Sequence, residues 1–263
     1  MKCIFCKVDT TNDRSIEHIL PESLGNTEHW LPAGIVCDKC NNYFAIKIEK
    51  PLLESSYFKL NRGSQEIFNK RGRLPSVPAV FLSKSDGFGA HLSTYGDSFY
   101  FQEDKDIVKL QNLSNKNTTF KLVMQLPPEY PEPNSMDRLL AKVALEALAY
   151  KAINHSLPLD EIVDHDTLDP LRSFARYGNG KGWNYHQRSL YDINKVWQDT
   201  DTNELYQCLH EFDFLYTKDQ ELYFVLIIFG IEYAINMGDT DIAGYITWLK
   251  EHDNKSPLNH TET

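Results

Sequence analysis

The sequence lacks any apolar run long enough to cross a bilayer. Its longest such run extends only from Leu222 to Ile231 and includes Gly230, whereas a spanning helix needs about 20 apolar positions. The N-terminal stretch, Met-Lys-Cys-Ile-Phe-Cys, contains no apolar core of a signal peptide. Internal repeats and low-complexity tracts are also absent. We therefore expect a cytoplasmic globular protein that does not enter the membrane, with a hydrophobic content of 41% to build its core.

Positive charge is scarce overall but is concentrated early in the chain. There are 27 Lys and Arg against 37 Asp and Glu, and this balance argues against non-specific coating of nucleic acid. The segment 1–75 holds 11 basic and 9 acidic side chains, whereas the rest holds 16 and 28. One group of basic residues lies within a stretch of sequence whose only acidic residue is Glu66. Its members are Lys59, Arg62, Lys70, Arg71 and Arg73. A nucleic-acid contact and a solvated surface loop both remain open for this group.

Cysteines are few, and four of the five form two identical pairs. These pairs are Cys3-x-x-Cys6 and Cys37-x-x-Cys40, separated by the segment 7–36. Two thiolates in a Cys-x-x-Cys turn bind one side of a tetrahedral ion, and a second pair completes the site. Disulfides would require export, and a redox motif explains only one pair. We therefore predict a structural zinc ion, and we expect Cys208 to be a buried, inert thiol.

The segment 1–60 predicts a small mixed structure around the cysteines. We expect a short strand that carries Glu17 and His18 on opposite faces. A helix should begin at Asn41 and stop before Pro51, and a second helical segment should cover 52–60.

The remainder of the chain predicts an arginine-, glycine- and proline-rich linker and then a larger body. Strands are expected over 79–82, 98–110, 119–126, 204–216 and 221–235, and helices over 136–153 and 242–251. The fold class is therefore α+β, divided into a head of residues 1–60, a linker of 61–78 and a body of 79–263.

Three side-chain types that suit metal-assisted hydrolysis lie between or beside the cysteine pairs. Glu17 and His18 are adjacent, and Asn41 directly follows Cys40. A carboxylate, an imidazole and an amide oxygen can together supply ligands for one hard divalent cation and one general base.

The stretch from Cys3 to about Leu60 resembles the HNH endonucleases, the zinc-stapled branch of the ββα-metal nucleases. That family combines Cys-x-x-Cys, an acid-His dipeptide with a following Pro, and Cys-x-x-Cys followed at once by His or Asn. Here the intervals from His18 to Cys37 and from His18 to Asn41 both agree with the family spacing. The resemblance covers less than a quarter of the chain.

The resemblance implies a ββα-metal head that cuts DNA. His18 would be the general base that takes a proton from water. Glu17 and Asn41 would bind a catalytic Mg²⁺ or Mn²⁺ ion that contacts the scissile phosphate. The zinc would be structural and would fix the hairpin against the helix that carries Asn41.

Two features of the head leave alternatives open. The family's middle Asn, which orients the His, falls at Pro32, so Asn26 or a backbone carbonyl would have to replace it. Lys47, Lys50 and Arg62 are candidates for contacts with DNA phosphates, but solvation at the surface explains them equally well.

These patterns together predict a metal-dependent DNA endonuclease. A role in restriction or phage defence is expected only by association with the family that the segment resembles. The acidic body is expected to bind a protein partner, a regulatory ligand or a second copy of the chain. A non-catalytic zinc adaptor that binds nucleic acid or protein is the alternative, and an RNA substrate also stays open.

Overall fold

The computed structural model describes residues 1–69, 71–83, 87–96, 98–114, 119, 121–124, 131, 136–180, 182–199 and 201–258. Lys70 of the basic group and positions 120, 125 and 126 of the strand expected over 119–126 lie outside these ranges. The chain forms two compact units, one of residues 1–50 with 133–263 and one of residues 51–132. The N-terminal segment 1–50 thus shares a unit with the second half of the chain, whereas we expected a head of 1–60, a linker of 61–78 and a body of 79–263.

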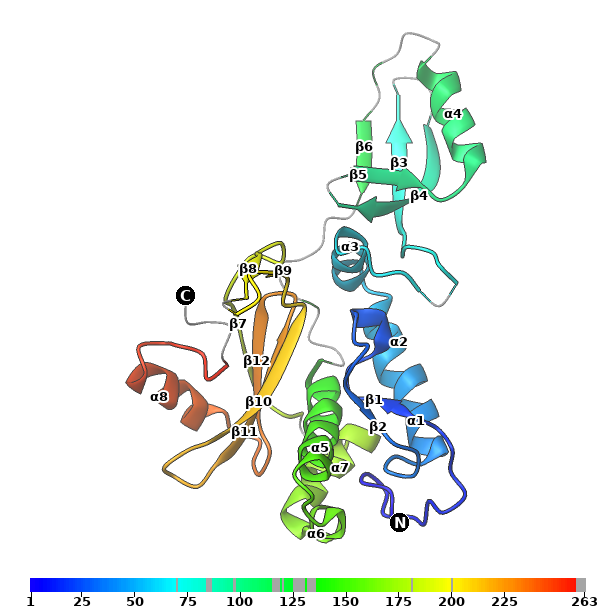
Figure 1. Ribbon diagram of the computed structural model, residues 1–263. Coiled ribbons are helices and arrows are strands. Elements are labelled where there is room, and N and C mark those ends of the chain that lie inside the picture. The colour runs from blue at the N-terminus through cyan, green and yellow to red at the C-terminus, as the bar shows by residue number, and fades with distance from the viewer. Residues whose placement is uncertain are drawn as a thin grey trace. The chain divides into compact units, whose positions relative to one another are not determined.

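The N-terminal part of the first unit is a two-stranded ladder followed by a helix. Its elements are β1 (Glu17–His18), η1 (Glu22–Leu24), β2 (Trp30–Leu31), α1 (Asp38–Phe44) and η2 (Ala45–Glu49). The next helix, α2 (Lys50–Leu53), begins at the last residue of this segment and continues into the second unit. β1 and β2 are antiparallel, with Glu17 opposite Leu31 and His18 opposite Trp30. Figure 1 shows this ladder beside α1.

The helix that carries Asn41 begins earlier and runs further than expected. Cys37 caps α1, because its thiol accepts a hydrogen bond from the Cys40 N–H, and so the helix begins at Asp38. It also continues past Pro51, because η2 is a π-helical turn in which the Lys50 N–H reaches the Ala45 carbonyl. Pro51 then lies in the first turn of α2, where proline is tolerated.

A buried helix forms the centre of the first unit. α5 (Met136–Asn154) is buried along most of its length and confirms the helix expected over 136–153. α6 (Leu159–Asp164), η3 (Asp166–Leu168) and α7 (Asp169–Tyr177) follow it and were not predicted. α7 lies beside α5 (Figure 1). A helix that is buried on most sides needs several neighbours, and α5 packs against η2, β2, α7 and strand β12 of the sheet described next.

A four-stranded antiparallel sheet completes this unit. Its strands run in the order β10-β11-β12-β7, with the bounds His210–Tyr216, Leu222–Ile228, Ile231–Asn236 and Tyr185–Ser189. α8 (Ala243–Glu251) covers one face through Tyr245 and Leu249, and α5 contacts the sheet at β12 (Figure 1). A small ladder of β8 (Trp197–Gln198) and β9 (Leu205–Tyr206) precedes β10.

The strand expected over 221–235 is wrong, because it is two strands. Phe229 and Gly230 have φ of 53° and 79° and turn the chain back between β11 and β12. Such left-handed turns join tight hairpins. Both strands are buried and largely apolar, so Gly230 is the only residue in the apolar stretch from Leu222 to Ile231 that indicates a turn. The expected hairpin closed near 217–220 is confirmed for β10 and β11. The single strand expected over 204–216 is wrong at its start, because Leu205–Tyr206 form β9 and pair with β8 instead.

The second unit is a smaller sheet with two helices. Its elements are α3 (Ser56–Ser64), β3 (Val77–Leu82), β4 (Gly87–Tyr95), β5 (Ser98–Phe101), α4 (Asp104–Ser114) and β6 (Lys121–Met124), and the sheet order is β5-β4-β3-β6. The strand expected over 98–110 is wrong after Phe101, because α4 begins at an acidic segment that suits a helix N-terminus.

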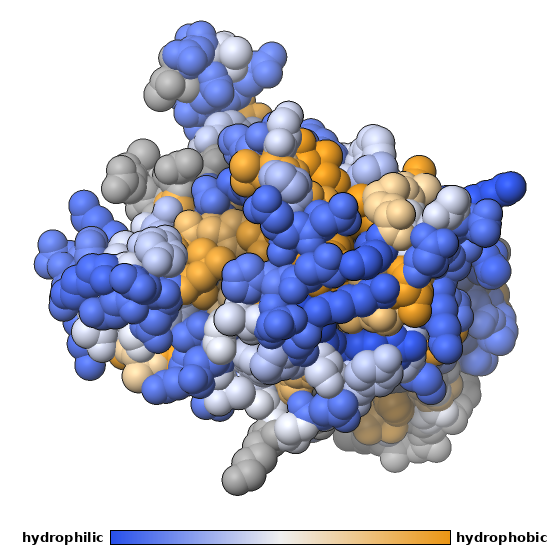
Figure 2. All heavy atoms as spheres, turned by 90° about the horizontal axis from the view of Figure 1, so that it is seen from below, coloured by the Kyte–Doolittle hydropathy of each residue, from blue (hydrophilic) through white to orange (hydrophobic). Residues whose placement is uncertain are grey.

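The fold as a whole is α+β, as expected, with the cysteine cluster near the N-terminus and a larger sheet-rich body. None of the helices in the described ranges combines the length and apolar character that a membrane crossing requires. Figure 2 shows one face of the molecule, on which hydrophilic residues predominate and apolar residues lie in separate patches between them.

Candidate active site and metal centre

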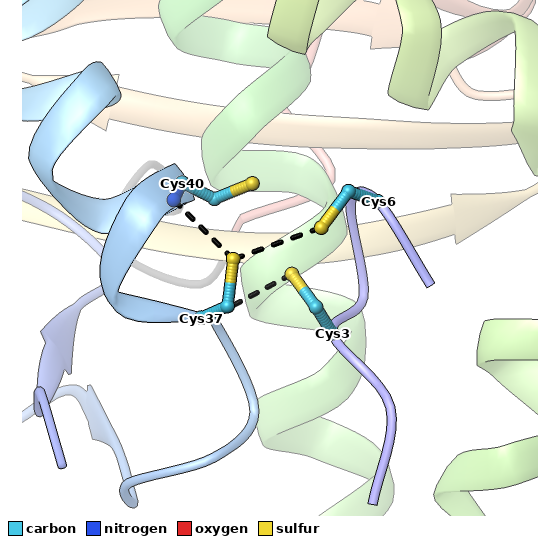
Figure 3. A group of neighbouring side chains, drawn as sticks. All are labelled: Cys3, Cys6, Cys37 and Cys40. Atoms are coloured by element: carbon cyan, nitrogen blue, oxygen red, sulfur yellow. Dashed lines mark hydrogen bonds between the residues drawn. The ribbon is translucent and has the colours of Figure 1, made fainter. Parts of the chain in front are cut away.

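The four paired cysteines converge at one point. Their Sγ atoms all lie within 4.8 Å of one another, and within the described ranges this is the one such group of three or more metal-binding side chains. Cys3 and Cys6 come from the N-terminal loop, while Cys37 and Cys40 begin α1 (Figure 3). The Sγ atoms of Cys6 and Cys37 are 3.6 Å apart, close to the edge of about 3.8 Å in a tetrahedral zinc–thiolate site. The donor set therefore fits zinc, whereas Cys208 lies outside it and is half-buried rather than buried as expected.

Backbone N–H groups and mutual hydrogen bonds prepare these thiols for a cation. The Cys37 N–H donates to Cys3 Sγ, and the Cys40 N–H donates to Cys37 Sγ, each at 3.4 Å. A hydrogen bond from Cys40 lowers the pKa of Cys3 to about 5, whereas Cys3 in turn raises the pKa of Cys40. Burial raises the pKa of Cys6 to about 11. The raised pKa values of Cys6 and Cys40 disfavour their thiolates in the absence of a cation, and a bound divalent ion would stabilise these thiolates.

Two buried arginines of α7, in the second half of the chain, contact the segments that carry the two cysteine pairs. Arg172 Nε donates to the carbonyl of Ile4, between the first two cysteines, at 2.8 Å. The Arg176 guanidinium lies 3.7 Å from the centre of the Tyr43 ring on α1 and opposes the raised pKa of Cys40. Sequence reasoning did not find these contacts, because each arginine lies far along the chain from its partner.

The β1–β2 ladder separates the acid from the histidine. Glu17 is only 5% exposed and Leu31 opposite it is fully buried, so this pair faces the core. His18 is half-buried and Trp30 opposite it is 47% exposed, so that pair faces outward. The expectation that Glu17 and His18 lie on opposite faces is confirmed.

Glu17 meets a buried lysine that the sequence did not indicate. Lys142 Nζ on α5 lies 2.7 Å from Glu17 Oε1, 2.8 Å from Glu49 Oε1 and 3.0 Å from Glu146 Oε2. It also donates to the His18 carbonyl at 3.2 Å. We call these four residues the Lys142 cluster: Glu17, Glu49, Lys142 and Glu146.

The Lys142 cluster is largely shielded from solvent, with Glu49 as its partly exposed member. Lys142 and Glu146 are fully buried. Burial raises the pKa of Glu17, and it raises that of Glu146 strongly. Burial alone would lower the pKa of Lys142, but the three carboxylates outweigh it and the pKa is raised well above its ordinary value. Lys142 is therefore a permanent cation that holds the acid of the acid-His dipeptide.

The structure brings Asn41 next to the acid-His strand. Its Nδ2 donates to the carbonyl of Ile16, directly before Glu17, at 3.2 Å. Since the amide nitrogen is used in this way, Oδ1 is the atom left for a ligand. His18 Nδ1 is buried and has no hydrogen-bond partner in the part of the chain that the structure describes.

Asn26 does not orient the histidine. Its side chain is fully buried and donates to the carbonyls of Leu20 and His29, both at 2.8 Å. Its Oδ1 accepts two backbone N–H groups of the same loop, so the amide has no capacity left for His18. With Pro32 at the family's middle position, the replacement for the orienting residue is not Asn26.

The three basic candidates lie in different surroundings. Lys47 and Lys50 are exposed on the helix that follows Asn41. Arg62 is only 6% exposed in the second unit, where burial lowers its pKa. A buried guanidinium does not face a phosphate backbone, so Arg62 is not retained as a DNA contact.

Comparison with known proteins agrees with this geometry at the level of the family. Residues 3–56 match the family model described as HNH endonuclease, which confirms the resemblance drawn from the motif spacing. The matched segment contains the four cysteines, Glu17, His18 and Asn41. No curated protein and no solved structure matches the chain. The N-terminal segment is therefore nuclease-like at family level, and a nucleic acid is the substrate that this family implies.

Proposed function

We propose that the protein is a metal-dependent endonuclease that hydrolyses DNA phosphodiester bonds, with His18 as the general base. The observation that carries this proposal is the hydrogen bond from Asn41 to Ile16, which brings the last motif residue against the acid-His strand. The family match over residues 3–56 supports the same assignment.

His18 lies on the outward face of the ladder, and a substrate would approach its ring from that side. A phosphodiester repels hydroxide, so cleavage needs a base beside the phosphate and a cation upon it. Imidazole is the side chain that changes charge near neutral pH, and it suits the removal of a proton from water.

Glu17 and Asn41 would hold the catalytic Mg²⁺ or Mn²⁺. Glu17 uses Oε1 in its ion pair with Lys142, so its second oxygen and Asn41 Oδ1 would be the protein ligands. Carboxylates that bind metals are commonly oriented by a second hydrogen-bonded partner, and Lys142 takes that position. The ion, when bound, supplies positive charge to the phosphate and the leaving oxygen. The four cysteines would hold a structural zinc ion.

Plasmid cleavage tests the role of His18. Supercoiled DNA is incubated with Mg²⁺ or Mn²⁺ and with wild type, His18→Ala or the control His155→Ala, whose side chain is exposed just after the end of α5. We expect His18→Ala to cut at least about 100-fold more slowly, because general-base catalysis contributes this much or more. The control should cut normally. Equal cutting by His18→Ala and wild type would overturn the assignment.

A non-catalytic zinc adaptor is the second candidate. Two observations favour it: Pro32 at the orienting position, and the unpartnered Nδ1 of His18 among the described residues. Specific retention of DNA with no cleavage under any divalent ion would support the adaptor. Cleavage of RNA but not DNA would instead change the substrate.

The biological setting and the partner of the body are finer proposals. The segment 76–263 holds 16 basic and 28 acidic side chains, which supports a protein partner, a regulatory ligand or a second copy there rather than DNA. Phage plating on cells that express wild type or His18→Ala tests a role in restriction or phage defence. Equal plating on both strains would count against that role.

A further inference from the structure

Trp30 differs from the other three tryptophans in its surroundings. Trp183 and Trp197 are 6% and 8% exposed, and Trp248 stacks on His252 with ring centres 4.1 Å apart. Trp30 is 47% exposed, and its indole contacts no other ring and makes no hydrogen bond within the described residues. An exposed aromatic ring beside the strand of the proposed general base offers a free face on which a nucleobase can stack.

The ladder register places this ring beside the proposed general base. Trp30 is directly opposite His18 in the β1–β2 pair, so both side chains leave the same face, with Cβ atoms about 5 Å apart. The neighbouring pair, Glu17 and Leu31, is buried. This burial fixes the register of the two strands and keeps His18 and Trp30 on the outer face.

The loop between the two strands is also held firmly. The Ile19 N–H donates to the His29 carbonyl at 3.1 Å, and the buried Asn26 amide closes the same loop. Trp30 therefore projects from a fixed backbone, and little conformational entropy is lost when a ligand stacks on it.

We propose that the indole of Trp30 stacks on an unpaired nucleobase next to the phosphate that is attacked by the water activated by His18. This inference rests on the proposed nuclease function. Stacking on an aromatic face binds bases of every sequence. A base inside a duplex offers no free face, so the preferred substrate is single-stranded or locally opened DNA. Trp30 would thus bind the nucleobase, and His18 would activate the water that attacks the adjacent phosphate.

Tryptophan fluorescence measures this contact without any cleavage. The zinc-loaded full-length protein is titrated with a dye-free single-stranded oligonucleotide, or with the matching duplex, in buffer without Mg²⁺ or Mn²⁺. We expect single-stranded DNA to quench the emission of wild type and of the control Trp248→Phe. Trp30→Phe should lose this quenching, because its remaining tryptophans are buried or stacked.

Affinity gives the second readout, by anisotropy of a labelled oligonucleotide. Trp30→Ala should bind single-stranded DNA about 5- to 150-fold more weakly, whereas Trp30→Phe should keep most of the affinity. Circular dichroism confirms folding of each variant, which is expected for an exposed position. Unchanged affinity of Trp30→Ala, or equal quenching by duplex, would overturn the proposal.

Two further outcomes separate this inference from the function on which it rests. If His18→Ala cuts as wild type does while Trp30→Ala loses affinity, the assignment of His18 fails and the stacking contact stands. If sedimentation shows a dimer that Trp30→Ala abolishes while DNA binding is unchanged, Trp30 is a protein contact and the stacking proposal is wrong.

Discussion

Replacement of Lys142 by Met should strongly destabilise the first unit. The ammonium lies within 2.7–3.0 Å of three carboxylates, and Met keeps a similar shape without the charge. Loss of one partner from a buried ion pair costs about 3–5 kcal/mol, because the charge left behind is uncompensated. We expect the free energy of unfolding to fall by at least this amount, a large part of the total stability of an ordinary domain.

The loss should depend on pH. Burial raises the pKa of Glu17 and Glu146 in the folded state, and removal of Lys142 takes away the cation that opposes this shift. A carboxyl with a raised folded-state pKa contributes stability that is complete below its unfolded pKa and is lost as pH rises through the folded one. Lys142→Met should therefore be closest to wild type in acid and furthest from it at neutral pH.

Urea denaturation followed by tryptophan fluorescence at pH 5 and pH 8 measures both effects. All four tryptophans lie in residues 1–50 and 133–263, so the emission reports this unit. The exposed Lys250→Met on α8 is the matched control and should stay within about 0.5 kcal/mol of wild type. Adding Glu146→Gln to Lys142→Met should recover part of the loss. A loss below about 1 kcal/mol at both pH values would refute the reasoning.

Two further predictions concern zinc and a turn. Cys40→Ser should lose the single zinc ion that we expect per chain, together with stability, while Cys208→Ser should keep it; metal analysis by mass spectrometry compares them, and equal zinc in both would disprove the site. Gly230→Ala should lower the free energy of unfolding by more than about 2 kcal/mol, because its Cβ would lie 2.1 Å from the Tyr191 carbonyl oxygen at a φ of +79°. Gly180→Ala, with a φ of +107° but open space, should cost less in the same denaturation assay.

Local sequence was sufficient wherever spacing along the chain decides the structure. The two Cys-x-x-Cys pairs predicted the metal centre because each pair is a single turn. Alternation predicted that Glu17 and His18 face opposite ways, and helical spacing predicted α5. Sequence reasoning was wrong over 98–110 and 221–235, where aromatic and apolar residues continue through a change of element or a turn. The turn at Phe229 requires a positive φ, and a phenylalanine in the sequence does not indicate such a backbone angle.

Tertiary structure alone decided what surrounds the candidate site. Lys142 meets Glu17, and Arg176 reaches Tyr43, although the members of each pair are far apart in the sequence. Neither contact leaves a periodic trace in the sequence, because the partners lie on elements that meet only when the chain packs. The motif thus determined which groups carry the proposed chemistry. The three-dimensional arrangement determined that the acid is held by a buried cation and that an exposed tryptophan lies beside the histidine.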